Sequence, residues 1–368
     1  MKKTIAIAAT MLAAQVCAAP LGLPEVPIPA ANPQTEEKVA LGQRLFNDTR
    51  FSSTGTVSCA TCHASGTAFT DSPKHVSEGI NQLTGTRNAP TVVNAAFNQT
   101  QFWDGRSPDL EDQALHPFLN PVEMGLPDHG PILATIRDDR GYTRAFKRVF
   151  NIDTSDITIK HVTQAIAAFE RTIVSGDSPF DRWYYGHDDN AIGDAAKRGF
   201  EVFLKEGRCV SCHSMEQDFA LFTDHKFHNI GIGINDIQGK VTGLARAFLV
   251  AKANGADVDV AVLTDADTSH LGRFAVTDDL SKMGAFKTPT LRNIAVTAPY
   301  MHDGSLDTLE EVVNHYNNGG ITDPQSGNPN DFLSGGIRPL NLTEQQITDL
   351  VAFMETLTSP TYANGGNR

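Results

Sequence analysis

Two short cysteine motifs hold the residues of this sequence that are best suited to chemistry. Residues 59–63 read Cys-Ala-Thr-Cys-His and residues 209–213 read Cys-Val-Ser-Cys-His. In a C-x-x-C-H motif both thiols form thioethers to one porphyrin, and the adjacent histidine ligates its iron. A redox dithiol or half of a zinc site would explain one motif, but the two together use every cysteine after position 17. We therefore expect two covalently bound haem c groups, attached through Cys59, Cys62, His63, Cys209, Cys212 and His213.

An amphipathic helix is predicted before each motif. Thr35, followed by Glu36 and Glu37, has the residue types of a helix start. Before the second motif, Asp194 is expected to cap a helix that ends at Gly207. The apolar positions of the two helices are Val39, Leu41, Leu45 and Phe46 in the first and Ala196, Phe200, Phe203 and Leu204 in the second.

The segments downstream of the motifs also resemble each other. Residues 166–175 read IAAFERTIVS and residues 350–359 read LVAFMETLTS, and both lie in stretches with helical apolar spacing. Thr343 and Gln346 have the spacing of a capping box for the second. The order of helix, C-x-x-C-H motif, long excursion and closing helix thus occurs twice. We expect a mainly α fold of two duplicated c-type cytochrome domains with long haem-wrapping loops, although two unrelated amphipathic helices would also explain the likeness.

Composition and turn residues indicate where the domains meet. The chain has 368 residues, which is about two domains of sequence. Between Ser178 and Asn190 several Asp, Pro and Gly residues interrupt the apolar pattern, so we expect domains over residues 19–182 and 183–368. Residues 222–280 suggest no function of their own, and we expect them to form loops packed near the second haem.

Residues 1–18 have the pattern of a cleaved secretory signal. Lys2 and Lys3 precede an apolar run, and Val16 and Ala18 suit the small-residue positions of a cleavage site. The run is shorter than the roughly 20 apolar residues that span a bilayer. An uncleaved or lipidated anchor at Cys17 is the alternative. We expect a periplasmic protein with no membrane span.

The net charge limits the kinds of partner. The formal charge is −13 at pH 7. A surface this acidic disfavours binding to nucleic acid and attracts basic patches on a partner protein.

Four further segments resemble the bacterial di-haem cytochrome c peroxidases and their relative MauG. They are Arg87-Asn88-Ala89-Pro90-Thr91, Phe102-Trp103-Asp104-Gly105-Arg106, Val122-Glu123-Met124, and Thr288-Pro289-Thr290-Leu291-Arg292-Asn293 with Thr297-Ala298-Pro299-Tyr300 beyond it. The resemblance runs from about Glu36 to Thr358, with the motifs in the family's order. It implies an oxidoreductase that reacts with H2O2 at a peroxidatic haem in the N-terminal domain and moves electrons through an electron-transfer haem in the C-terminal domain.

The resemblance also implies roles for three pocket residues. Trp103 matches the tryptophan between the haems, whose indole relays an electron or a hole. Glu123 matches the acid of the peroxidatic pocket, which moves a proton between the two oxygens of peroxide and assists O–O cleavage. Gln113 matches a neighbouring position more weakly. Ordinary core packing for Trp103 and a solvated loop position for Glu123 are the alternatives.

A calcium ion is implied between the domains. Asn88, Thr297 and Pro299 resemble the positions that hold it, through one side-chain amide oxygen and two backbone carbonyls. Calcium prefers such oxygen ligands, with waters completing its shell. Turn formation by Asn and Pro is the alternative explanation.

Two positions depart from the peroxidases. The loop histidine that caps the first haem in many of them corresponds to Ile80 here, and His75 lies five residues out of register. The methionine that ligates the second haem corresponds to Tyr316, and MauG has tyrosine there. A phenolate stabilises ferric over ferrous iron, whereas a thioether does the reverse. We expect an open first iron and a second iron ligated by His213 and Tyr316; the alternative ligands are His75, His315, Met283 and Met301.

Both departures favour the MauG-like branch. We expect an enzyme that uses H2O2 to oxidise tryptophan side chains of a periplasmic partner protein through a high-valent di-haem state. A di-haem peroxidase that reduces H2O2 to water with electrons from a small cytochrome c or cupredoxin is the first alternative. A non-catalytic electron carrier with two six-coordinate irons is the second, and it leaves Glu123 without a role.

Overall fold

The structure is a computed structural model that describes residues 19–321 and 330–363. The predicted secretory signal at residues 1–18 lies outside the described residues. Among the residues that are described, no helix combines the length and the apolar character needed to cross a membrane.

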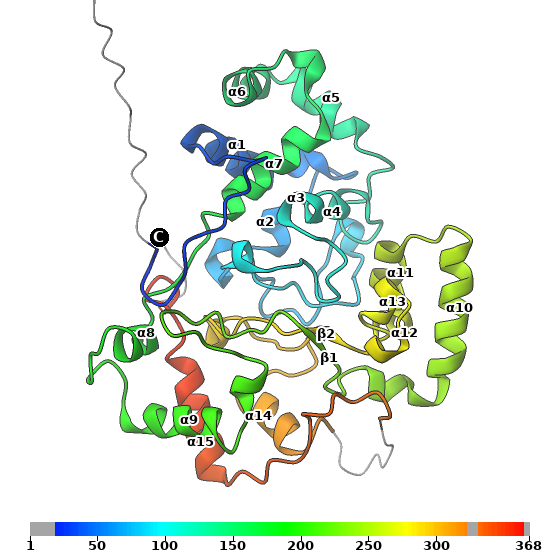
Figure 1. Cartoon of the computed structure of the whole chain (residues 1–368). Helices are drawn as coiled ribbons and strands as arrows, with labels where there is room; N and C mark the ends of the chain where they lie inside the picture. Colours follow the sequence, from blue (N-terminus) through cyan, green and yellow to red (C-terminus); the bar gives the residue numbers. More distant parts are fainter. Residues whose placement is uncertain (1–18, 322–329, 364–368) are drawn as a thin grey trace, which may run out of the picture.

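The regular structure is mainly helical, as predicted, with very little sheet (Figure 1). Strands β1 (Phe227–His228) and β2 (Phe286–Lys287) pair antiparallel, with Phe227 opposite Lys287. Within the described ranges the α-helices are α1 (Glu36–Phe46), α2 (Cys59–Cys62), α3 (Leu110–Gln113), α4 (His116–Leu119), α5 (Gly130–Asp138), α6 (Arg140–Phe150), α7 (Ile159–Glu170), α8 (Pro179–Tyr184), α9 (Asp194–Leu204), α10 (Val241–Ala253), α11 (Val258–Thr264), α12 (Ala266–Ser269), α13 (Phe274–Thr277), α14 (Leu309–Asn317) and α15 (Glu344–Glu355).

The helix before the first haem motif, α1, crosses α7. It begins where predicted, because the Thr35 side chain accepts a hydrogen bond from the Lys38 backbone N–H at 3.2 Å. A Cβ atom at Gly42 would lie 1.8 Å from the carbonyl oxygen of Ala165, so glycine is needed for this close approach. Buried residues around the crossing include Leu41, Leu45, Phe46, Val162 and Ile166.

The helix before the second motif, α9, crosses α15 in the same way. A Cβ atom at Gly199 would lie 1.8 Å from the carbonyl oxygen of Asp349. The capping box predicted for α15 is confirmed, since the Thr343 N–H donates to Gln346 Oε1 at 3.0 Å and the Gln346 N–H donates to the Thr343 hydroxyl. In Figure 1 the α1 and α7 pair lies at the top and the α9 and α15 pair at the bottom.

Two details of α9 differ from the prediction. Gly193 is its N-cap and Asp194 its first residue, so Asp194 does not cap it. A carboxylate in the first turn instead favours the helix through its dipole. The helix also ends at Leu204, before Gly207, whose N–H donates to the Val202 carbonyl at 2.8 Å.

The loops that follow the two motifs repeat the same contacts. The Thr91 hydroxyl donates to the Ala68 carbonyl at 2.6 Å, and the Thr290 hydroxyl donates to the Leu221 carbonyl at 2.7 Å. Further along, bridges between Gln101 and Ser107 and between Tyr300 and Leu306 close two short turns. The first of these turns carries Trp103, and the second carries His302 at the corresponding position.

These two turns are exchanged between the halves of the chain. The Lys287 N–H donates to the Trp103 carbonyl at 2.8 Å, and the Asn88 N–H donates to the His302 carbonyl at 2.8 Å. Each turn is therefore anchored on the segment that precedes the other one.

The stretch expected to separate the domains contains helix α8. Ser178 and Asp181 form its capping box, and Phe180 is fully buried against Phe222 and Phe353. Helix α8 therefore packs with the apolar cluster of the second helix pair, and residue 182 falls inside it.

The expectation that residues 222–280 are loops is wrong. They include α10 to α13, which enclose an apolar cluster of their own and lie at the right of Figure 1. Scattered Gly and Asp residues conceal the helical spacing in the sequence, but caps such as Asp257 start these short helices. The segment also contacts the first half, where the Thr86 hydroxyl donates to the Val262 carbonyl at 2.6 Å.

Candidate functional site

The first C-x-x-C-H motif lies on α2 and the residue that follows it. Burial raises the pKa of the Cys62 thiol to about 12, and its sulfur lies 3.9 Å from the Glu78 carbonyl oxygen. His63 Nδ1 lies 3.1 Å from the Phe69 carbonyl oxygen. A carbonyl oxygen can only accept, so Nδ1 carries the proton and Nε2 keeps its lone pair. Burial lowers the pKa of His63, which keeps the ring neutral.

The second motif is arranged in the same way. His213 Nδ1 lies 2.8 Å from the Phe222 carbonyl oxygen, and burial again lowers the pKa of the ring. Phe69 and Phe222 both adopt positive φ angles, of 55° and 53°, which turn their carbonyls toward the histidines. A neutral imidazole with Nδ1 bonded to the backbone is oriented to ligate a metal through Nε2.

A cavity of about 570 Å³ lies beside the second motif. Its lining includes the residues that would attach and ligate a haem, and apolar side chains from α9, α14 and α15 complete the walls. Burial raises the pKa of Tyr316 above its ordinary value. Two thiols, a neutral histidine, a phenol and an apolar surround fit a c-type haem. The lining residues used in this argument are Cys209, Cys212, His213, Tyr316, Phe203 and Met354.

Trp103 lies on the wall of this cavity, although it belongs to the first half of the chain. Its indole N–H donates to the Asn88 carbonyl at 2.9 Å. Its own carbonyl accepts from Lys287, so both ends of the residue are held. The hydrogen bonds of Trp103 therefore fix an aromatic ring of the first half against the cavity beside the second motif.

Glu123 is half-buried in the first half. Burial raises the pKa of its carboxyl group to about 8, and the negative charge of Asp259 adds to the rise, while Arg106 opposes it. Its Oε2 atom is buried without a hydrogen-bond partner in the described residues. A buried acid that is neutral at pH 7 can donate a proton, which is the property a general acid needs.

Ile80 lies beside the turn that carries Glu123. Its N–H donates to the Glu123 carbonyl at 2.9 Å, and its buried side chain packs against Gly125. The Ile80 side chain has no atom that could ligate iron. His75 lies elsewhere: its Nδ1 is 2.6 Å from the Gly304 carbonyl oxygen, and its Nε2 is 3.6 Å from Asp307 Oδ1.

The three residues predicted to hold calcium border the same cavity. Asn88, Thr297 and Pro299 all line the cavity beside the second motif. The Asn88 amide N–H donates to the His75 carbonyl at 3.1 Å, so its orientation is fixed. Gln113 ends α3 and is half-buried in the first half.

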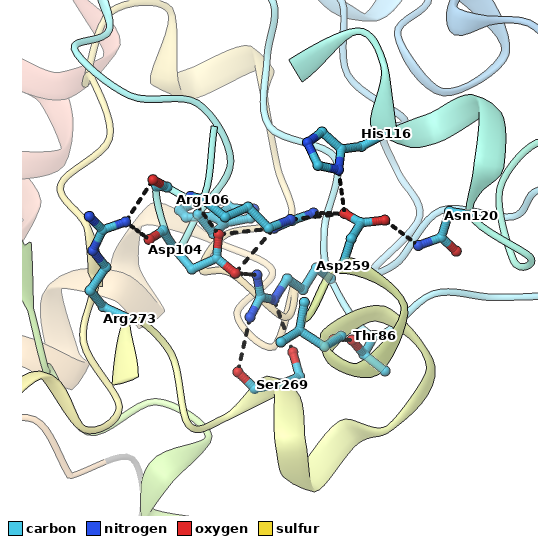
Figure 2. A network of polar contacts seen from close by, with 12 residues as sticks. Thr86, Asp104, Arg106, His116, Asn120, Asp259, Ser269 and Arg273 are labelled. Atoms are coloured by element: carbon cyan, nitrogen blue, oxygen red, sulfur yellow. Dashed lines mark hydrogen bonds and ion pairs between the residues drawn. The ribbon is translucent and has the colours of Figure 1, made fainter. Parts of the chain in front are cut away.

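A buried network of charges joins Asp104, which follows Trp103 in the sequence, to Asp259 through Arg106, and Figure 2 shows it from close by. Asp104 accepts hydrogen bonds from Arg87 at 2.6 Å and from Arg106 at 2.9 Å. Burial alone would raise the pKa of Asp104, but the two guanidinium groups lower it well below its usual value. Arg106 also pairs with Asp259 at 2.7 Å, and Arg273 donates to the Asp104 carbonyl.

Sequence reasoning missed two buried ionisable groups. Burial raises the pKa of Glu170 to about 8, and its Oε2 atom has no partner among the described residues. Its charge also contributes to raising the pKa of Cys59. Burial lowers the pKa of Lys287 to about 8, and this residue lines the cavity. The signal for Glu170 was present, because the alignment of the two closing segments places it opposite Met354.

Several known proteins are similar to this chain along most of its length. A family model described as di-haem cytochrome c peroxidase matches residues 36–189. The methylamine utilization protein MauG of Methylorubrum extorquens is 38% identical over 332 residues, which cover 90% of this chain and 81% of that protein. The cytochrome-c peroxidase IdrP1 of Denitromonas iodatirespirans is 36% identical over 366 residues, which cover 96% of this chain and 91% of that protein.

A solved structure is similar along nearly the whole chain. It is that of a MauG-like protein associated with microbial copper homeostasis, with a TM-score of 0.75 and 32% identity, and the match covers 96% of this chain and 99% of the other. Since relatives of both names align along most of its length, this chain belongs to the di-haem cytochrome c peroxidase and MauG family, whose members are haem-dependent oxidoreductases of the peroxidase type with two covalently bound haem c groups.

Proposed function

We propose that this protein is a MauG-like di-haem oxidase that uses H2O2 to oxidise tryptophan side chains of a partner protein. The observation that supports this most directly is that Tyr316 lines the same cavity as His213. A hard anionic ligand at that position favours the oxidised forms of iron. When bound, the haems supply the iron chemistry that reduces peroxide and holds the two oxidising equivalents.

The first haem site is open to peroxide in this proposal. Ile80 offers no ligand at the position of the capping histidine, and the His75 ring is bonded to Gly304 instead. The His75 side chain is also 59% exposed, which a buried iron ligand would not be. Peroxide can then react with the fully oxidised protein, without a prior electron to release a ligand.

Glu123 handles the protons of the reaction. Its carboxyl group is neutral at pH 7 and its Oε2 atom is unpaired, so it can donate a proton to the departing oxygen of peroxide. Reduction of one H2O2 to two waters consumes two electrons and two protons. In our proposal both electrons come from side chains of the partner protein.

Trp103 carries charge between the two haem sites. The indole N–H of Trp103 is bonded to Asn88 and its backbone carbonyl to Lys287. These two bonds restrict the rotation of the side chain and fix the position of the ring. A fixed aromatic ring between the two haem sites divides the electron transfer into two steps over shorter distances. The partner can therefore be oxidised at the protein surface and needs no channel to the first haem.

We also propose a domain organisation, a calcium ion and a cellular location for the protein. Repeated contacts, such as those of Gly42 and Gly199 with the facing helices, support two duplicated c-type cytochrome domains, with helix α8 packed on the second of them. Asn88 from the first half and Thr297 and Pro299 from the second line one cavity, which supports a calcium ion that ties the halves together. The pattern of residues 1–18 supports export to the periplasm.

Peroxide detoxification is the second candidate. The similarity to the cytochrome-c peroxidase IdrP1 over 96% of this chain favours it. The same Glu123 and Trp103 would serve, with electrons supplied by a small cytochrome c or cupredoxin. The two functions differ in whether the oxidised protein needs an electron before it reacts.

The deciding experiment adds one equivalent of H2O2 to the fully oxidised holoprotein. Soret and near-infrared absorption are followed within seconds. We expect a rapid change with a near-infrared band from charge shared between the haems. A protein that stays unchanged until one electron is added would contradict our proposal and favour the peroxidase.

A further inference from the structure

Helix α11 brings a buried carboxylate from the second half of the chain to the first. Asp259 Oδ1 accepts from Arg106 Nε at 2.8 Å and from a terminal nitrogen of the same guanidinium at 2.7 Å. Its Oδ2 accepts from the Asn120 amide N–H at 2.7 Å. The His116 ring lies 3.9 Å from Oδ1. Figure 2 shows these contacts converging on Asp259.

Asn120 forms the turn that presents Glu123. Its side-chain Oδ1 accepts from the Val122 N–H at 3.1 Å. Its backbone carbonyl accepts from the N–H groups of Glu123 at 3.1 Å and Gly125 at 2.9 Å. Asn120 is 1% exposed, so water does not replace these bonds. The orientation of its amide therefore sets the shape of the turn.

We propose that Asp259 is a positioning residue for Glu123: it fixes the Asn120 amide and the Arg106 guanidinium on either side of the turn that carries the acid. The proposal deepens the function proposed above and rests on it. It gives residues 222–280 a role, because their helix α11 completes the peroxide site of the other half.

The chemistry of the neighbours explains why a carboxylate is needed at this position. Arg106 and the Asn120 amide nitrogen present only donors to Asp259. A carboxylate accepts from both at once, whereas an asparagine would turn its own N–H groups toward one of them. One buried donor would then lose its partner, which is costly inside a protein.

The charged groups around Glu123 come from several elements. Arg106 follows the Trp103 turn, Asp259 lies on α11, and His116 lies on α4 next to Asp259. Cys59 and Cys62 also lie within electrostatic range, but they do not titrate once they form thioethers. Neutralising Asp259 removes a negative charge and leaves Arg106 in place, so Glu123 should ionise at lower pH.

A double-mutant cycle on the oxidised holoprotein tests the inference. Asp259→Asn, Glu123→Gln and the double variant are compared in the rate of cyanide binding to the first haem as a function of pH. We expect Asp259→Asn to change the rate about fivefold and to move its pH dependence to lower pH. In the Glu123→Gln background the same change should have no effect, because the group that it positions cannot ionise.

Two further variants serve as a control and as a substitute for Asp259→Asn. Asp267→Asn removes an exposed ion pair with Lys240 on the same segment, and it should bind cyanide as the wild type does. If Asp259→Asn does not fold, Asn120→Ala cuts the same link while it leaves the Arg106 pair and the Asp259 charge intact. It should change the rate of cyanide binding without moving its pH dependence, and the change should be absent in the Glu123→Gln background.

The outcomes separate the inference from the proposed function. If Glu123→Gln alone changes neither cyanide binding nor the reaction with peroxide, the role proposed for Glu123 is wrong. The positioning role of Asp259 is overturned if Glu123→Gln changes cyanide binding but Asp259→Asn does not. It is also overturned if Asp259→Asn has the same effect in the wild type and in the Glu123→Gln variant.

Discussion

The indole N–H of Trp103 donates to the backbone carbonyl of Asn88 at 2.9 Å. Asn88 is also one of the three residues proposed to hold calcium, and its side chain is bonded to the His75 loop. The relay residue and the proposed metal site therefore share one backbone unit.

Replacing Trp103 with Phe should leave the haem content unchanged and abolish oxidation of the partner protein. Phenylalanine is harder to oxidise than tryptophan and cannot donate to Asn88. Haem content is measured by the absorbance of the reduced holoprotein, and partner oxidation by mass spectrometry. The other tryptophan, Trp183, packs in the second cluster, so Trp183→Phe is the matched control. Partner oxidation that persists in Trp103→Phe would count against the relay.

The reaction with peroxide should slow as the pH rises through about 8. Burial raises the pKa of Glu123 to about 8, so its carboxyl group is protonated below this pH and ionised above it. Only the protonated form can donate to the departing oxygen. Stopped-flow rates of the reaction with peroxide, measured on one preparation of the holoprotein between pH 6 and pH 10, would show the decline. Glu123→Gln should be slow at every pH, and a variant that keeps the wild-type profile would assign the titration to another group.

Replacing Tyr316 with Met should raise the reduction potential of the second haem. A phenolate stabilises ferric iron, and a thioether stabilises ferrous iron. Spectroelectrochemical titration of the holoprotein measures the shift. Tyr300→Phe changes another tyrosine of the same cavity, one whose hydroxyl donates to the Ile294 carbonyl, and it should leave the potential near that of the wild type. Equal potentials for Tyr316→Met and the wild type would mean that Tyr316 is not a ligand.

Replacing Gly42 with Ala should destabilise the protein by about 1–3 kcal/mol, because the added methyl group would overlap the Ala165 carbonyl oxygen. Gly243→Ala is the matched control, since Gly243 lies within α10 and a Cβ atom there meets nothing within 4 Å. That change should stabilise the helix by about 0.5–1 kcal/mol. Denaturant unfolding of the holoprotein measures both. A Gly42→Ala variant as stable as the wild type would mean that the two helices separate at little cost.

The sequence predicts most strongly where local chemistry decides the structure. The cap of α1 at Thr35 and the capping box of α15 depend on residues within one helical turn, and both are confirmed. The start of α9 was misplaced by one residue, because glycine and aspartate are both common at a cap.

Features that depend on distant residues could not be predicted. Glu123 was identified by resemblance, but its raised pKa depends on burial and on Asp259, which lies 136 positions further along the chain. Helices α11 to α13 have only seven, four and four residues, so their short apolar runs carry little signal alone, whereas the 13-residue α10 was missed despite its length. Glu170 aligns with the apolar Met354, which hinted at burial, but the raised pKa of its carboxyl group depends on packing that only the folded structure shows.

The reciprocal backbone bonds of the Trp103 and His302 turns also determine what a fragment of this protein would lack. Each turn is hydrogen-bonded to the opposite half of the chain, so each half contributes residues to the inner wall of the other. A polypeptide of residues 183–368 alone would have the second haem motif but not the wall that Trp103 provides. Water would reach that haem from the missing side. The second haem site is therefore closed only when both halves are present.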